Sequence, residues 1–233
     1  MATYESLLAE VLNFEIDAPR HLKNIPNVNT EEYTELWVDA TTLEEDLSIE
    51  ESIGLYNGLQ WLKEFQDGCD GIHIVTVSFL RNLHKAALKH DVKRRGYLRQ
   101  QADDVVGSLC PFTDAWYRYL EPINVISKLE SLCDKINILV LGWQTDKDLH
   151  VLIRMCGWFF HEFVTLHPFL DGNGRIARFV VLHLLAMLFS VPIPLFSCTR
   201  LKFLQCIVGP CINNCKPVAL TQMIADCVTE FLK

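Results

Sequence analysis

The sequence lacks the features that mark nucleic-acid-binding, secreted and repeat proteins. Its 21 Lys and Arg residues are outnumbered by 29 Asp and Glu residues, so the formal net charge is −8. A surface that binds nucleic acid usually carries a basic patch, and we therefore expect no nucleic-acid partner. The chain shows no basic N-terminal region followed by an apolar stretch, no internal repeats and no low-complexity segments. We expect a protein without a signal peptide that acts in the cytoplasm.

The nine cysteines form neither a disulfide framework nor a complete metal-binding pattern. Their number is odd, and they are scattered along the chain. Cys211 and Cys215 lie close together in sequence, but no nearby histidine completes a zinc site. We therefore expect reduced intracellular thiols that pack as small apolar side chains.

Residues 179–196 contain no Asp, Glu, Lys or Arg, and this length could span a bilayer. His183 interrupts the apolar run, and Pro192 and Pro194 would end a helix there. These features favour a buried central helix over residues 174–190, hydrophobic nearly all round, rather than a membrane span. We expect no membrane partner.

The remaining pattern predicts a helical domain with one small β element. Half of the residues are hydrophobic, which suffices for a core. Capping boxes that begin at Ser48 and Thr145 predict two helix starts. The basic stretch before Gly96 breaks the helical pattern, and we predict a two-stranded flap over residues 97–112. Helices are predicted over residues 6–14, 31–43, 49–67, 72–89 (wholly helical or after a short extended entry), 122–141, 146–166, 174–190, 199–208 and 217–232.

Residues 167–178 form the stretch around which the chain is organised. Pro168 biases His167 away from helical geometry, so a helix should end there. Gly172 and Gly174 let the backbone turn tightly and approach a ligand closely, and Asn173 tolerates left-handed geometry. The first N–H groups of the following helix have no internal partner and would face a ligand in this loop.

Charged residues complete the pattern of a phosphate site. Arg175 and Arg178 are three residues apart and share one face of the first helical turn. Cations are unfavourable at a helix N-terminus, and a bound polyphosphate would remove that conflict. Asp171 is the one acid of the loop and a candidate Mg²⁺ ligand, while His167 can accept a proton near neutral pH.

This run resembles the Fic family motif, His-Pro-Phe-x-(Asp/Glu)-Gly-Asn-Gly-Arg-x-x-Arg, at every defined position. The flanks are similar as well: His84 after a leucine, the run from Gly96 to Arg99 that opens the family's flap, and Glu121-Pro122 after it. The resemblance covers residues 70–205 and implies an all-α Fic-fold bundle with a small β-hairpin flap. We expect residues 1–69 to be an N-terminal helical extension packed on this core. Residues 206–233 should add a C-terminal helix to the same domain.

The resemblance implies a protein adenylyltransferase that moves AMP from ATP to a Ser, Thr or Tyr hydroxyl of a target protein. His167 would be the general base and Asp171 the Mg²⁺ ligand. The backbone amides of Gly172, Asn173 and Gly174 would hold the phosphates. In the family, the first motif arginine (here Arg175) orients the β-phosphate and the second (here Arg178) the γ-phosphate. A target segment would dock by strand addition on the flap at residues 97–112, and a homodimer is possible.

Other activities of the same site stay open. One is hydrolytic removal of AMP, and another is transfer of UMP, phosphate or phosphocholine. A lysine at position 174 would favour phosphotransfer, but this chain has Gly174. A helical adaptor that binds nucleotide without turnover is the non-enzymatic alternative. His161, six residues before His167, is interpreted as a core or supporting histidine rather than a catalytic one.

Many family members also carry an inhibitory (Ser/Thr)-x-x-x-Glu-(Gly/Asn) helix whose glutamate pairs with the second motif arginine. Thr41 and Glu45 fit this spacing, although Asp46 follows where Gly or Asn is typical, and Glu44 is an equally close candidate. Ordinary helix-capping acids explain them equally well. Leu182 also replaces an asparagine that many members carry four residues after the second arginine.

Overall fold

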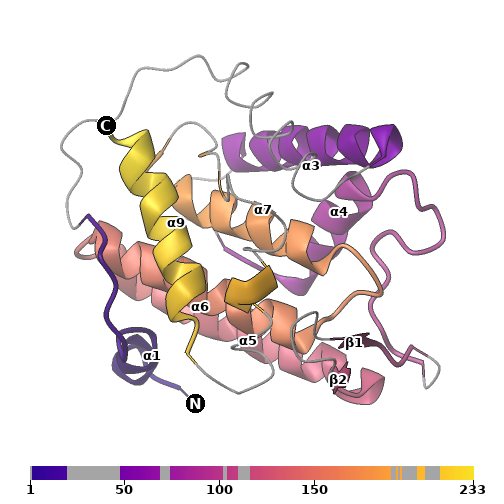
Figure 1. Cartoon of the computed structure of the whole chain (residues 1–233), viewed down its shortest axis with the longest axis horizontal. Coiled ribbons are helices and arrows are strands. Elements are labelled where there is room, and N and C mark those ends of the chain that lie inside the picture. Colours follow the sequence, from indigo (N-terminus) through magenta and orange to yellow (C-terminus); the bar gives the residue numbers. More distant parts are fainter. Residues whose placement is uncertain are drawn as a thin grey trace.

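The computed structural model describes residues 2–19, 48–68, 74–101, 104–109, 116–189, 193, 195, 204–207 and 216–233. Its helices are α1 (Tyr4–Val11), α3 (Ile49–Asp67), α4 (Val77–Ala87), α5 (Pro122–Trp143), α6 (Leu149–Leu166), α7 (Asn173–Leu185) and α9 (Val218–Phe231). Strands β1 (Gly107–Leu109) and β2 (Trp116–Arg118) pair as an antiparallel two-stranded sheet. The predicted all-α fold with a small β-hairpin is confirmed (Figure 1).

Helix α6 is the centre of the molecule and packs against α1, α5, α7 and α9 (Figure 1). Nearly every side chain on α6 is buried, which explains why its sequence is apolar around the whole helix. Gly157 brings the backbone of α6 close to Thr221 of α9, since a Cβ atom there would collide with the threonine side chain. The ends of α6 and its neighbours therefore have fixed positions relative to one another.

Helix α7 is the predicted central buried helix. All of its residues except Gly174 are buried, and it packs between α6, α3 and α4. It ends at Leu185, five residues earlier than predicted. In the part of the chain that the structure describes, none of the helices has the length and hydropathy needed to cross a bilayer.

Several predicted boundaries need correction. Helix α1 begins at Tyr4 and ends at Val11, two to three residues before the predicted limits. Gly142 does not end α5, which continues to Trp143, and the glycine makes room for the ring of Tyr4. The capping box predicted at Thr145 is wrong: Asp148 caps α6, and its side chain accepts the N–H groups of His150 and Val151.

Other predictions agree with the structure. The capping box at Ser48 is present, and α3 spans the predicted residues. Residues 74–76 are extended and precede α4, which agrees with the predicted alternative of a short extended entry before the helix. Thr76 caps the helix. Residues 204–207 form a helical turn within the predicted 199–208 helix. The predicted helix over 31–43 lies outside the described residues, and the division at residues 69 and 205 stays a prediction.

The hairpin is displaced from the predicted flap. Only β1 falls within residues 97–112, and the second strand follows at Trp116–Arg118. The aromatic residues of this second segment are typical of a strand, but they lay beyond the predicted boundary. A separate bridge pairs Leu98 with Phe169, so the segment before the hairpin is tied to the loop after α6.

Candidate active site

The end of α6 orients His167. The residue has left-handed backbone geometry (φ 51°, ψ 61°), and its N–H donates to the carbonyl of Phe163 at 3.0 Å. Pro168 cannot continue the helix and disfavours α-helical geometry in the residue before it. The chain therefore turns at His167, as predicted from the Pro168 position.

The loop that follows is closed by Asn173. Its side-chain Oδ1 accepts the N–H of Phe169 at 3.0 Å, and its Nδ2 donates to the carbonyl of Phe169 at 2.9 Å. Because Asn173 is buried, this pair of hydrogen bonds is protected from water. The Asn173 side chain thus holds the loop shut, and its backbone N–H is the part that a ligand could use.

The two glycines of the motif have different surroundings. Gly172 has a positive φ of 73°, and a Cβ atom there would lie 2.8 Å from Leu88. Gly174 lies within the first turn of α7, and among the described residues no atom beyond its own helical turn comes within 4 Å of the position that a Cβ atom would take. Open space therefore adjoins the first N–H groups of α7, the place where an anion binds most readily.

Asp171 lies at the mouth of this space with about half of its side chain exposed. Its Oδ1 accepts the N–H of Gly172 at 2.6 Å, and its Oδ2 lies 3.3 Å from Nη2 of Arg175. Within the described residues, no group of three or more His, Cys, Asp or Glu side chains could hold a metal alone. A lone, anchored carboxylate fits Mg²⁺, which commonly takes one or two carboxylates together with phosphate oxygens.

The two motif arginines are buried in the first turns of α7. Nη1 of Arg175 lies 3.6 Å from Oε1 of Glu51 on α3, so Arg175 is held between two carboxylates, those of Glu51 and Asp171. Arg178 is fully buried one turn further along. Glu51 was missed in the sequence because its spacing from Ser48 already explains it as a capping residue, a role that it also fills.

His84 supports the same loop from α4. The N–H of Gly96 donates to Nδ1 of His84 at 2.7 Å, and this places the ring proton on Nε2, which lies 3.1 Å from the carbonyl of Asp171. The ring stacks on Phe169 with 3.9 Å between centroids. Burial, together with the nearby Arg175, lowers the pKa of His84 to about 4, so the neutral ring is the stable form.

Arg99 joins the flap segment to the end of α6. Its guanidinium is fully buried and donates to the carbonyls of His167 (2.6 Å) and Leu166 (3.1 Å). It also donates to the carbonyls of Leu120 (3.0 Å) and Asp104 (3.2 Å) on either side of the hairpin. The last carbonyl groups of a helix need such partners, and a cation suits the negative end of the helix dipole.

Tyr119 covers the ring of His167. The two rings stack with 3.8 Å between centroids and 15° between planes. Nδ1 of His167 lies 3.4 Å from the carbonyl of Val164, a weak contact that favours the proton on this nitrogen. Burial and the Arg99 cation lower the pKa of His167 to about 4, so its Nε2 carries a lone pair at neutral pH.

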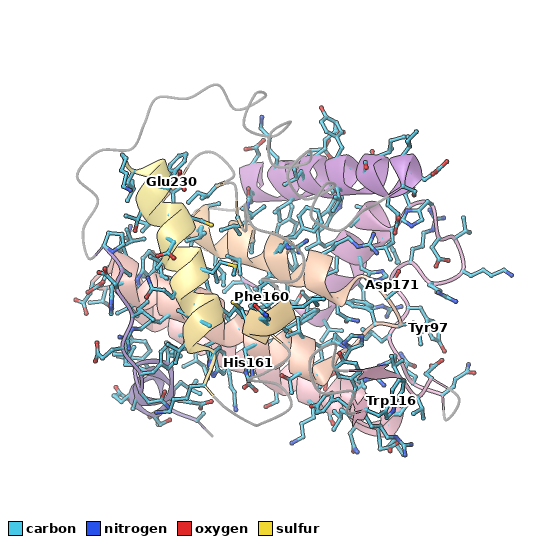
Figure 2. The ribbon with its side chains drawn as sticks, viewed as in Figure 1. Tyr97, Trp116, Phe160, His161, Asp171 and Glu230 are labelled. Atoms are coloured by element: carbon cyan, nitrogen blue, oxygen red, sulfur yellow. The ribbon has the colours of Figure 1, made fainter. Side chains whose placement is uncertain are left out.

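The structure therefore brings His167, Asp171, Gly172, Asn173, Gly174 and Arg175 together at one end of the molecule. Figure 2 shows three labelled residues at this end: Asp171 on the loop after α6, Tyr97 on the segment after α4, and Trp116 on strand β2. His161 is buried on α6 and lies nearer the middle of the molecule in the same view. Leu182 is a buried core residue. Glu44 and Glu45 lie outside the described residues.

Structural comparison finds solved proteins of the same fold. A Fic domain-containing signalling protein from Bacteroides thetaiotaomicron has a TM-score of 0.64 at 19% identity, covering 99% of this chain and 94% of that one. Fic-1 from C. elegans has a TM-score of 0.57 at 18% identity (98% and 68% covered). IbpAFic2 covalently tethered to Cdc42 has a TM-score of 0.62 at 15% identity (97% and 70% covered).

Sequence comparison agrees. A Fido domain-containing protein from Dictyostelium discoideum is 43% identical over 42 residues, which span 18% of this chain and 29% of that relative. The model of the Fic/DOC family matches residues 74–185, the segment from the entry of α4 to the end of α7. This segment contains every residue of the loop described above. Residues 74–185 of this chain are therefore similar to the Fic/DOC family.

Proposed function

We propose that this protein transfers AMP from ATP to a hydroxyl side chain of another protein. Proteins of the Fic/DOC family are in general nucleotidyl or phosphoryl transferases. The observation that carries the proposal is the juxtaposition of three features: a histidine with an available Nε2, the open space beside Gly174, and an anchored carboxylate at Asp171. A base, an anion pocket and a metal ligand are the groups that such a transfer needs.

In this proposal the triphosphate occupies the open space at the start of α7. The backbone N–H groups of Asn173 and Gly174 donate to phosphate oxygens. Arg175, already held at the loop by two carboxylates, orients the β-phosphate, and Arg178 the γ-phosphate. The N–H of Gly172 donates to Asp171 in this structure, so Gly172 would contribute its tight turn more than a phosphate contact. Asp171 would hold Mg²⁺, which supplies charge neutralisation on the phosphates when bound.

His167 then takes the proton of the target hydroxyl at Nε2. The hydroxyl oxygen forms a bond to the α-phosphorus, and the bond from that phosphorus to the bridging oxygen breaks, releasing pyrophosphate. A base with a pKa near 4 is weak, but the negative triphosphate beside it favours the imidazolium form and raises that pKa. A positioned base of this kind contributes roughly 10²–10⁴-fold to the rate.

A target segment would add as a strand to the flap. Within the described residues, β1 and β2 pair only with each other, so each strand has one unpaired edge for another chain. Arg99 links both sides of this hairpin to the carbonyl of His167, so a segment docked there would approach the base. The fold-related IbpAFic2 was captured tethered to the protein Cdc42, which supports a protein as the acceptor. A homodimer stays a prediction.

The test uses ATP labelled at the α-phosphate and, in parallel, at the γ-phosphate, with Mg²⁺ and a cell extract as the source of targets. We expect protein label from the α-position only, lost in His167→Ala and retained in the matched control His90→Ala, an exposed histidine. Label from the γ-position would contradict AMP transfer and indicate phosphotransfer. Release of AMP from pre-labelled protein would instead indicate the reverse reaction.

A second arm addresses the two glutamates proposed as inhibitory. If Glu45 or Glu44 blocks productive placement of the γ-phosphate, Glu45→Gly or Glu44→Gly will raise automodification. Unchanged activity in both variants would remove this proposal. If ATP binds by calorimetry and no variant transfers any group, the adaptor alternative holds.

A further inference from the structure

The chain is acidic overall, but one segment carries a concentrated positive charge. Residues 81–95 contain six of the 21 Lys and Arg residues and a single acid, Asp91. All six cations are exposed. They lie on α4 and on the turn after it, directly before Gly96, whose N–H donates to His84. The positive segment therefore adjoins the loop of the candidate active site.

Part of this segment lines a groove of about 460 Å³ between α3 and α4. The two helices lie side by side, as Figure 1 shows. Lys85, Lys89 and Arg95 supply three cations to the groove, and Glu64 is the one acid among the described residues that line it. The side-chain amides of Asn57 and Gln60 on α3 and of Asn82 on α4 add polar groups to its walls.

This surface suits an acidic peptide segment. Carboxylates would pair with the cations, and side-chain amides can both donate to and accept from a peptide backbone. Because the rest of the chain is strongly acidic, an acidic partner is repelled elsewhere and attracted here. An anionic bilayer would meet the same repulsion from the rest of the surface.

His84 connects the groove to the loop of the candidate site. Lys85 follows His84, whose Nε2 lies 3.1 Å from the carbonyl of Asp171. Arg95 precedes Gly96, whose N–H donates to the same histidine. A segment held by Lys85, Lys89 and Arg95 would thus lie beside the loop that carries Asp171.

We propose that the groove between α3 and α4 docks an acidic segment of the protein that is modified, close to the hydroxyl-bearing segment on the flap. The inference rests on the proposed transfer function. It adds a class of substrate: target proteins with a cluster of Asp or Glu residues near the modified segment.

The test compares two double variants with the same change in net charge. Lys89→Glu/Arg95→Glu reverses the positive charge of the groove. Lys85 is left unchanged, because its aliphatic stem packs over Gly96. Lys147→Glu/Lys233→Glu is the control, at two exposed residues outside the groove. Thermal unfolding first verifies that both variants are folded, as expected for exposed positions.

The probes are fluorescein-labelled peptides in which serine alternates with glutamate or with lysine, followed by fluorescence anisotropy. We expect the glutamate peptide to bind wild type and to bind the groove variant about tenfold or more weakly, with the control within about twofold. Added salt should weaken the binding. Absence of glutamate-peptide binding, equal loss in both variants, or equal binding of the lysine peptide would overturn the proposal. Groove-dependent sedimentation with phosphatidylserine vesicles and no peptide binding would overturn it in favour of a membrane contact.

Labelling of extract proteins from α-labelled ATP separates this proposal from the function on which it rests. We expect the groove variant to label target proteins less than the control does, with automodification unchanged. Normal target labelling and normal peptide binding in the groove variant would overturn the docking site and leave the transfer function standing. Groove-dependent peptide binding without any labelling by wild type or by the Glu44→Gly and Glu45→Gly variants would overturn the transfer function and leave an acidic-segment site.

Discussion

The loop at residues 168–172 is supported on two sides by two histidines that serve opposite purposes. His167 ends α6 on one side, and His84 projects from α4 on the other. Each ring stacks on an aromatic ring, and burial lowers each pKa to about 4. The difference lies in their hydrogen bonds. Both ring nitrogens of His84 are used, whereas His167 has one weak contact at Nδ1 and an available Nε2.

The backbone around each ring produces this difference. Gly96 has a positive φ of 71°, and its N–H reaches the Nδ1 of His84. On the other side, left-handed geometry at His167 turns its backbone carbonyl toward Arg99, and the imidazole is left beside Tyr119. One histidine is therefore a structural support, and the other can do chemistry.

The largest expected effect separates the two residues by substitution with asparagine. His167→Asn should lower AMP transfer roughly 10²–10⁴-fold, because the base is lost. The free energy of unfolding should change little, because the substitution removes few contacts. His84→Asn should lower the free energy of unfolding by about 1–3 kcal/mol through loss of a buried hydrogen-bonded ring, while transfer falls less than about tenfold. Urea unfolding and the labelling assay measure the two quantities. A reversed pattern would assign the chemistry to His84.

The pH dependence of stability should show both histidines. Since each folded-state pKa lies near 4, below the ordinary 6.5, the unfolded chain takes up protons first as the pH falls. The contribution of the two histidines to the free energy of unfolding is fully present above about pH 6.5 and is lost as the pH falls toward 4. The buried His84 alone should contribute up to about 1.4 kcal/mol per pH unit in this window. Urea unfolding at several pH values in this window gives the free energy of unfolding as a function of pH. We expect this free energy to change less steeply with pH in His84→Asn than in wild type, and an equal pH dependence would contradict the assignment.

The stacked ring of Tyr119 should assist His167 and leave His84 unaffected. An aromatic face stabilises a cation, so the stack favours His167 when it becomes protonated in the transfer step. Tyr119→Leu should lower transfer about three- to tenfold, and Tyr119→Phe, which keeps the face, should stay within about twofold of wild type. The His167 imidazole pKa, followed by NMR, should fall in the Leu variant only. Equal activity of the two variants would remove this role.

The smallest effect concerns Glu51, which holds Arg175 from α3. Glu51→Gln keeps the capping box with Ser48 and removes a carboxylate that a phosphate must compete with for Arg175. ATP should bind roughly two- to fivefold more tightly, since a partly exposed ion pair contributes up to about 1 kcal/mol. Calorimetry with Glu50→Gln, an exposed residue of the same turn, as control measures this change. Weaker binding in Glu51→Gln would mean that Glu51 orients Arg175 for the phosphate.

Local signals in the sequence were sufficient where one segment determines its own structure. Pro168 after an apolar helical pattern predicted the turn at His167, and the Ser48 capping box predicted the start of α3. They failed where a distant segment decides. Gly142 was expected to end a helix, but the ring of Tyr4 packs there and the helix continues. The second strand of the hairpin was placed too early, because strand pairing is not visible within one short segment.

The sequence by itself determined the helical fold class and the motif at residues 167–178, because periodicity, capping residues, Pro168 and the glycines act over a few residues. Only the tertiary structure showed that Asn173 closes the loop, that Glu51 reaches Arg175 from another helix, and that Arg99 ties the hairpin to His167. The structure also showed that both ring nitrogens of His84 are hydrogen-bonded, whereas Nε2 of His167 is available for chemistry. The contacts of Glu51 and Arg99 join segments that are far apart along the chain, and their partners are selected by packing in three dimensions rather than by sequence spacing.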